Sequence, residues 1–166
     1  MRTDRCHDAV TKLLAKDLAG WTGLPATCTL TQLPRIEVGT VEQAVVLGDE
    51  SLVATYRRAK ADAYAEPIKV YLRGDTIVRI SIQLPELSDP AGLLAKLGAP
   101  DAKLDAWFAT TPTVHHEAEW VYAQRGLALV LSSNRQNVME LIVYPSTTAE
   151  RYRKQLRYFE VPRESE

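Results

Sequence analysis

The chain has 166 residues, and 20 Lys and Arg against 21 Asp and Glu give it a formal net charge of −1. Apolar residues make up 46% and charged residues 25%, which is typical of a folded globular protein and excludes a disordered one. A near-neutral chain has no overall attraction to nucleic acid or membranes, and no apolar run is long enough to span a bilayer. We therefore expect one domain whose binding preferences come from local patches.

The polar residues 1–5 lack an apolar segment, so we predict no signal peptide and a cytoplasmic location. Residues 4–20 have the spacing of an amphipathic helix, whose apolar stripe is Val10, Leu13, Leu14, Leu18 and Trp21. For Cys6 and Cys28 two interpretations stay open. We favour free thiols in a reducing cytosol over a disulfide that joins the first helix to the following loop.

Residues 26–50 carry weak signals, which are a short strand near 28–31 and a helical turn at 40–44. From residue 52 the apolar residues recur with period two, the pattern of β-strands. We predict three successive strands, at 53–61, 67–73 and 76–84. Gly74 and Asp75 fit a tight turn between the last two.

The second half repeats this order. Asp89 fits the cap of a helix over 91–97, with Pro90 at its first position and Gly98 at its end. Residues 99–117 are predicted as a long loop with a short helix at 104–108. Three strands at 118–124, 127–132 and 138–144 follow, and then a last helix at 148–158.

A short passage occurs twice. Leu-Leu-Ala-Lys at 13–16 leads to Gly-Leu-Pro at 23–25, and the same tetrapeptide at 93–96 leads to Gly-Ala-Pro at 98–100. Each copy precedes a predicted hairpin, and these end at Pro85 and Pro145. We interpret the chain as one α+β domain of two tandem units (about 4–87 and 88–147) and a C-terminal helix (148–159). Each unit is a helix followed by three antiparallel strands, and the units share one sheet with their helices on one face.

The Gly-Ala-Pro at 98–100, followed by Trp120-Val121-Tyr122, resembles a helix–loop–sheet repeat. The pattern is that of β-lactamase inhibitory proteins and of small lipoproteins in the outer-membrane β-barrel assembly machinery. Thr55-Tyr56 is the weaker counterpart in the first unit. The resemblance implies a non-enzymatic protein that binds other proteins across a sheet face or its loops. The chain lacks a lipobox before Cys6 and a cysteine pair within each repeat, and no site residue of those families is transferred.

The sequence offers little catalytic chemistry. His115 and His116 are adjacent on an extended segment and therefore point in opposite directions, so we expect no metal site and no cofactor. Cys6 and His7 would lie about 100° apart on a helix, which disfavours a Cys–His nucleophile. We also find no serine-nucleophile elbow and no glycine-rich nucleotide motif. We predict no catalytic residue.

One sheet face of the first unit is predicted to be basic and aromatic. If Val70, Leu72 and Ile80 face the helices, the opposite face carries arginine, lysine and tyrosine, and arginine and aromatic residues often anchor protein interfaces. The predicted partner-binding residues are Tyr56, Arg58, Lys69, Tyr71, Arg73, Arg79 and Trp107. We predict a non-catalytic protein-binding module of inhibitor or immunity type. Three alternatives stay open, namely single-stranded nucleic-acid binding on this face, a solvated face without a partner, and a ligand or enzyme pocket between helices and sheet.

The strand at 138–144 is apolar on both faces and needs cover from both sides. The loop at 99–117, with Trp107 and Phe108, is one candidate for this cover. A second subunit is the other, in a homodimer through Val138, Ile142 and Tyr144.

Overall fold

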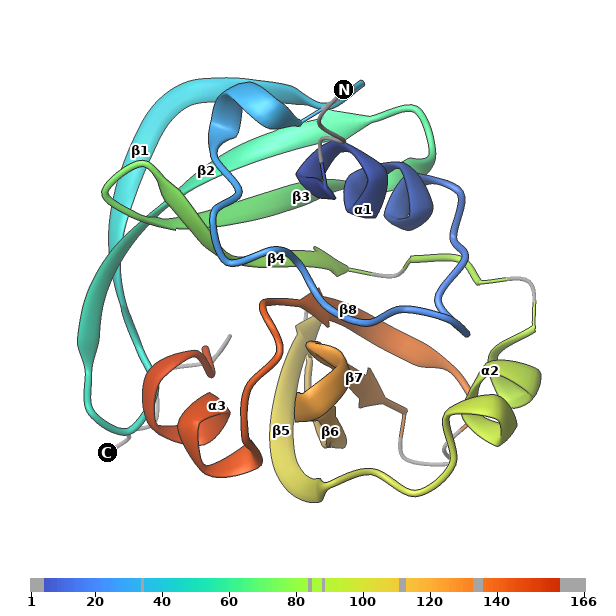
Figure 1. Cartoon of the computed structure of the whole chain (residues 1–166). Coiled ribbons are helices and arrows are strands. Elements are labelled where there is room, and N and C mark those ends of the chain that lie inside the picture. Colours follow the sequence, from blue (N-terminus) through green and yellow to red (C-terminus); the bar gives the residue numbers. More distant parts are fainter. Residues whose placement is uncertain are drawn as a thin grey trace.

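The computed structural model describes residues 5–158 except positions 34, 84, 88, 111–112 and 133–135, and within this range it describes no side chains over 106–117. The described chain is an α+β fold with one antiparallel sheet of eight strands (Figure 1). The strands are β1 (Glu37–Leu47), β2 (Leu52–Ala61), β3 (Tyr64–Arg73), β4 (Thr76–Gln83), β5 (Ala102–Thr110), β6 (Thr113–Tyr122), β7 (Leu127–Leu131) and β8 (Val138–Val143). The helices are α1 (Arg5–Leu14), α2 (Pro90–Leu97) and α3 (Ala149–Gln155), with 3-10 turns η1 (Leu30–Gln32) and η2 (Ala123–Arg125).

The sheet consists of two four-stranded meanders that meet at their last strands. The strand order is β1-β2-β3-β4-β8-β7-β6-β5, and β4 pairs antiparallel with β8 through Ile80↔Val143 and Ile82↔Leu141. This junction lies in the middle of the sheet. β1 and β5 are consequently its two edges.

One face of the sheet carries the main apolar core, under α1 and α2. Val10 and Leu13 of α1 are fully buried against strand residues such as Ile68, Val70 and Leu141. α1 ends at Leu14, earlier than predicted, but Leu18 and Trp21 stay buried in the segment that follows. The predicted apolar stripe is therefore inside, although only its first part is helical.

The predicted starts of the other two helices are confirmed. The side chain of Asp89 accepts a hydrogen bond from the Gly92 amide at 3.0 Å and caps α2, with Pro90 in the first turn. The side chain of Thr148 accepts from the Arg151 amide at 3.1 Å and caps α3. In both places the cap satisfies an amide that the helix itself leaves without a partner.

The prediction missed one strand in each meander. The helical turn at 40–44 lies in β1, and the helix at 104–108 lies in β5, so both helical predictions were wrong. Residues 99–117 are mostly the β5–β6 hairpin rather than a loop. Pairing decides such segments, because β propensity depends on what a strand packs against.

The two cysteines form a disulfide, with 5.4 Å between their Cα atoms. The favoured interpretation of free thiols was wrong, and the alternative that joins the first helix to the following loop is right. The loop reaches α1 because it crosses to the start of β4, where the Ile77 amide donates to the Cys28 carbonyl at 2.8 Å. No helix in the described part of the chain is long and apolar enough to cross a membrane.

Candidate functional site

The predicted basic and aromatic face is not open, because α3 and the residues after it cover it. Tyr71 and Arg79 are completely buried and Tyr56 is 8% exposed, so the expected exposure of these three was wrong. The Tyr158 ring lies 5.8 Å from the Tyr71 ring, between centroids. We call the sheet face that carries Tyr56, Tyr71 and Arg79 the α3 face. The sequence placed these residues on one face correctly but gave no sign that the chain's own C-terminus would cover them.

The remaining predicted contacts are divided. Arg58 is exposed on β2, while Lys69 and Arg73 on β3 are half-buried. The Lys69 ammonium lies 5.4 Å from the centre of the Tyr56 ring, which ties it to the covered group. The side chain of Trp107 lies outside the described residues, so its role stays a prediction.

Donors from the first meander hold the C-terminal end of α3. Backbone amides of the β1–β2 turn donate to carbonyls of α3 and the residues after it: Gly48 to Arg157 at 2.6 Å and Glu50 to Lys154 at 2.9 Å. The Arg73 guanidinium donates to a further α3 carbonyl at 2.6 Å. The last carbonyls of a helix lack intrahelical partners, and here residues of the sheet and of its β1–β2 turn donate hydrogen bonds to them.

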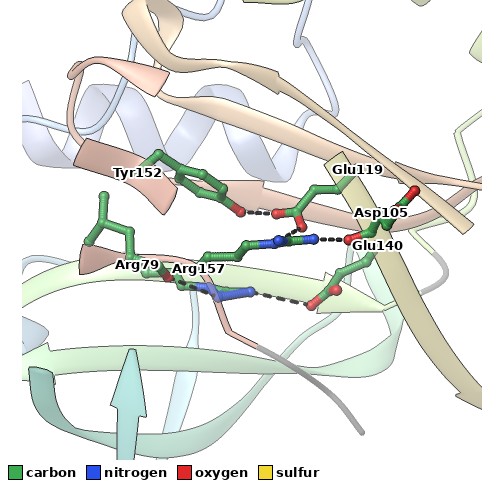
Figure 2. A network of polar contacts seen from close by, with 7 residues as sticks. Arg79, Asp105, Glu119, Glu140, Tyr152 and Arg157 are labelled. Carbon is green, nitrogen blue, oxygen red and sulfur yellow. Dashed lines mark hydrogen bonds and ion pairs between the residues drawn. The ribbon is translucent and has the colours of Figure 1, made fainter. Parts of the chain in front are cut away.

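Beneath α3 lies a buried polar network, drawn in Figure 2. Arg157 donates through Nε to Glu119 of β6 at 2.7 Å. Tyr152 of α3 donates to the second oxygen of the same carboxylate, and Arg157 also donates to the Asp105 carbonyl of β5. Side chains of α3 and its C-terminal extension therefore also bind the second meander, and α3 bridges the two halves of the sheet.

A second ion pair lies beside the first. Arg79 of β4 faces Glu140 of β8 at 3.7 Å, donates to the Leu156 carbonyl at 3.4 Å and stacks 4.8 Å from the centre of the Tyr71 ring. With Arg157 and Glu119, the buried group holds two guanidinium groups and two carboxylates. Among these four described side chains the charges balance, and a buried charge requires a partner of opposite sign.

The surroundings shift the pKa values of two members of this network, Arg79 and Tyr152, away from neutral pH. Burial lowers the pKa of Arg79, but nearby Tyr71 and Tyr152 and the carboxylates of Glu140 and Glu119 raise it further, and the net pKa lies above the ordinary value. Burial, and then Glu119, hold the pKa of Tyr152 well above its usual value. Arg79 thus stays charged and Tyr152 stays protonated, which suits a structural network better than general acid–base catalysis.

Open depressions of the surface lie elsewhere. One of about 790 Å³ lies beside Arg5, Thr27 and Pro145, and one of about 870 Å³ lies beside Arg35, Lys60 and neighbouring loop residues. Neither is lined by the network residues. The helix–sheet interface is filled by apolar side chains, an arrangement that disfavours the alternative of a ligand pocket there.

Metal chemistry finds no support in the described part of the chain, where no group of three or more His, Cys, Asp or Glu could hold an ion. The side chains of His115 and His116 fall outside the described residues.

The predicted dimer contacts are already covered within one chain. Val138, Ile142 and Tyr144 are 8%, 1% and 0% exposed. The Tyr152 ring of α3 lies 4.8 Å from the Tyr144 ring, and α3 packs against Ile142 and Tyr144, whereas Val138 lies in the core under α1 and α2. Ala102 and Leu104 of β5 pack against the same cluster as Ile142 and Tyr144, so residues 99–117 supply part of the cover, while the side chains of Trp107 and Phe108 lie outside the described residues. The expectation of a second subunit over Val138, Ile142 and Tyr144 is corrected, because these residues are buried within one chain.

The exposed apolar surface is on the β1–β2 hairpin, which the sequence reasoning missed. The large apolar side chains exposed in the described chain are Val41, Val46 and Val53, at 72%, 56% and 71%. Val46 and Val53 are direct cross-strand partners, and Ala44 and Thr55 form the next pair on the same face. We call these four residues the valine patch. The sequence held one signal for it, the β-branched residues of 38–46.

Comparisons of the chain with family models, with curated proteins and with solved structures found no match.

Proposed function

We propose that the chain is a non-catalytic protein-binding module of inhibitor or immunity type, which contacts its partner with the valine patch. The single observation that carries this proposal is the concentration of exposed apolar side chains on one hairpin. Exposed apolar groups on soluble proteins gather where another molecule binds. The function agrees with the resemblance to inhibitory proteins, while the surface differs from the predicted one.

The rest of the hairpin supports a surface of this kind. Arg57 pairs with Glu42 at 2.9 Å, at the end of the valine patch. Arg58 is exposed on the same strand but on its other side. An apolar centre with charged groups at its rim is the usual composition of a protein interface.

The test is affinity capture by the double variant Val46→Ser, Val53→Ser. We expect it to lose a stoichiometric protein partner that the wild-type chain retains after nuclease treatment and moderate salt. Val41→Ser is the matched control, because it removes the same apolar group from the same hairpin outside the patch. Equal loss in both variants, or no loss in the double variant, would contradict the proposed surface. Nucleic acid that salt removes from the eluate would instead favour the nucleic-acid alternative.

We also infer that the two halves are related units, each a helix followed by four strands. α1 precedes the meander β1–β4 and α2 precedes the meander β5–β8, which supports this inference. The units would have four strands rather than the three predicted. Circular dichroism of the fragment 88–147, which lacks α3, would test whether this unit folds by itself. We expect the fragment not to fold, because α3 covers β8 in the full chain.

The disulfide bears on location. Disulfides persist in oxidising compartments and are rare in the cytosol, so Cys6–Cys28 supports a location outside the cytosol, against the cytoplasmic prediction. Alkylation of the protein in freshly lysed source cells, read by intact mass, distinguishes a cytoplasmic location from one in an oxidising compartment. Two alkylated thiols would support the cytoplasmic prediction, and none would support the oxidising compartment.

A further inference from the structure

Four basic residues lie on α3 and on the described segment that follows it, and three of them pair with a carboxylate. These pairs are Arg153 with Asp49, Lys154 with Glu150 and Arg157 with Glu119, at 3.3, 3.3 and 2.7 Å. Arg151 is exposed and has no such partner among the described residues. Its charged neighbour is instead a second arginine, Arg73 at the end of β3.

One residue, Gln155, holds both of these guanidinium groups at the end of α3. Arg73 donates through Nη2 to the Gln155 carbonyl at 2.6 Å, and Arg151 donates through Nε to the Gln155 side-chain oxygen at 3.1 Å. Glu50 accepts from the amide nitrogen of the same side chain at 3.2 Å, but within the described chain it forms no ion pair with either arginine. Burial, and then the charge of Arg151, lower the pKa of Arg73 below its ordinary value. Two positive charges therefore lie close together and share uncharged acceptors.

Most donors of the two groups have no acceptor within the part of the chain that the structure describes. A guanidinium carries five N–H donors, and the contacts with Gln155 use one from each group. The Nε of Arg73 is buried without a partner, whereas its Nη1, also unpaired, is not buried. The Nη1 of Arg73 and both Nη atoms of Arg151 are thus left to bind a group from solvent.

Arg79 shows how this side of the sheet satisfies a guanidinium with its own residues. It faces the Glu140 carboxylate at 3.7 Å and donates to the Leu156 carbonyl at 3.4 Å. Arg73 and Arg151 have uncharged acceptors but no counter-charge among the described residues. An acceptor with negative charge is therefore the partner that this arrangement lacks.

We propose that Arg73 and Arg151 form a binding site for a phosphate group, either the free ion or the monoester of a small molecule. A phosphate monoester carries a charge of about −1.5 to −2 at neutral pH, which two guanidinium groups balance, whereas a carboxylate would balance only one of them. Arginine also binds phosphate oxygens through parallel N–H donors, and the unpaired Nη atoms supply these. Arg73 lies on β3 and Arg151 on α3, so a phosphate bound to both stabilises the docking of α3 on the sheet.

The site does not depend on the proposed function, because the valine patch lies on the opposite face of the sheet. Val53 of the patch alternates along β2 with Ala54 and Tyr56, which pack with Tyr71 on the α3 face. Loss of a protein partner in the Val46→Ser, Val53→Ser variant and loss of phosphate binding are therefore separate results.

The first test is a titration of the full chain with inorganic phosphate at constant ionic strength, followed through the arginine Nε–H signals in heteronuclear NMR. The Nε of Arg73 suits this measurement, because burial slows its exchange with water, and Arg73→Lys assigns its signal. We expect the signal to shift with a Kd on the order of 1 mM. Acetate at the same ionic strength should bind about tenfold more weakly, because it carries half the charge and two oxygens. An Arg73 signal that does not move with phosphate, or that moves equally with acetate, would overturn the proposal.

Phenyl phosphate, titrated in the same way, distinguishes the two sources of the phosphate group. Binding at least as tight as that of inorganic phosphate assigns the site to a monoester. Binding of inorganic phosphate alone assigns it to the free ion.

Variants separate this site from a general attraction of anions to basic residues. Arg151→Gln should weaken phosphate binding about tenfold or more, because it removes one of the two charges and its hydrogen bonds. Arg58→Gln is the matched control, since it removes the same charge from another exposed arginine, on β2, and it should bind like the wild-type chain. Arg151→Lys keeps the charge without the planar donors, so its affinity should lie between those of the wild-type chain and Arg151→Gln. Equal phosphate affinity of Arg151→Gln and Arg58→Gln would overturn the proposal.

Discussion

The two faces of this sheet are covered by different kinds of contact. Under α1 and α2 the contacts are almost entirely apolar, as between Leu13 and Ile68. Under α3 the sheet carries the buried side chains of Arg79, Glu119 and Glu140. Tyr152 and other polar groups of the C-terminal segment contact them. Apolar packing tolerates many arrangements, whereas buried charges require specific partners, so the α3 face fixes the position of the C-terminal segment more narrowly.

The largest expected loss of stability comes from removing a buried charge on the α3 face. Arg79→Ala leaves Glu140 buried without its guanidinium, and we expect it to lower the free energy of unfolding by about 3–5 kcal/mol, measured by urea denaturation. The double variant Arg79→Met, Glu140→Met should return most of this stability, because an apolar pair of similar volume needs no partner charge. Equal destabilisation by the single and double variants would show that the ion pair is not what matters at this position.

The next largest loss of stability is expected on the other face of the sheet, under α1 and α2. Replacing both cysteines of the Cys6–Cys28 disulfide by alanine should lower the free energy of unfolding by about 3 kcal/mol, since the unfolded chain gains the freedom of the closed loop. Denaturation of the wild-type chain with and without reductant gives an independent value. Agreement between the two measurements is expected, and no change in either would contradict a structural role of the disulfide.

A smaller effect tests how the β1–β2 turn holds α3. Gly48 has φ of 73°, and a Cβ there would overlap the Lys154 carbonyl, so Gly48→Ala should cost about 2–3 kcal/mol. Gly74 has φ of 63° but open space around it, so Gly74→Ala should cost about 1 kcal/mol from the backbone alone. Thermal unfolding of the two variants separates loss of the α3 contact from strain. Equal costs would mean that the turn does not position α3.

The smallest effect appears only in alkali. Burial raises the pKa of Tyr64 above its usual value near 10, and its hydroxyl donates to the Leu13 carbonyl at 2.5 Å. The stabilisation from the neutral hydroxyl is fully present below pH 10 and falls as the pH rises toward the folded-state pKa, because only the unfolded chain ionises in that range. Between pH 10 and 11 we expect the wild-type chain to lose about 1 kcal/mol more than Tyr64→Phe, measured by urea denaturation. Parallel loss in both would assign the alkaline effect to other tyrosines, such as Tyr152 on the α3 face.

The sequence itself determined the features that depend on local patterns. The alternation of apolar residues placed β2, β3, β4, β7 and β8, and the cap residue Asp89 placed the start of α2. The same alternation correctly put Tyr71 and Arg79 on the face opposite Val70. These signals act over a few residues, and the chain carries them wherever it folds.

The tertiary structure alone decided what covers each face and edge. Nothing near Tyr71 in the sequence indicates that residues after 148 fold over it, since that contact depends on amides of the β1–β2 turn and on Glu119 from β6. β1 and β5 were missed because their own propensities are mixed and pairing with a neighbour decides them. The disulfide was undecided for the same reason, because the distance between Cys6 and Cys28 is set by how α1 and the loop pack on the sheet, and local sequence patterns carry no information about that packing.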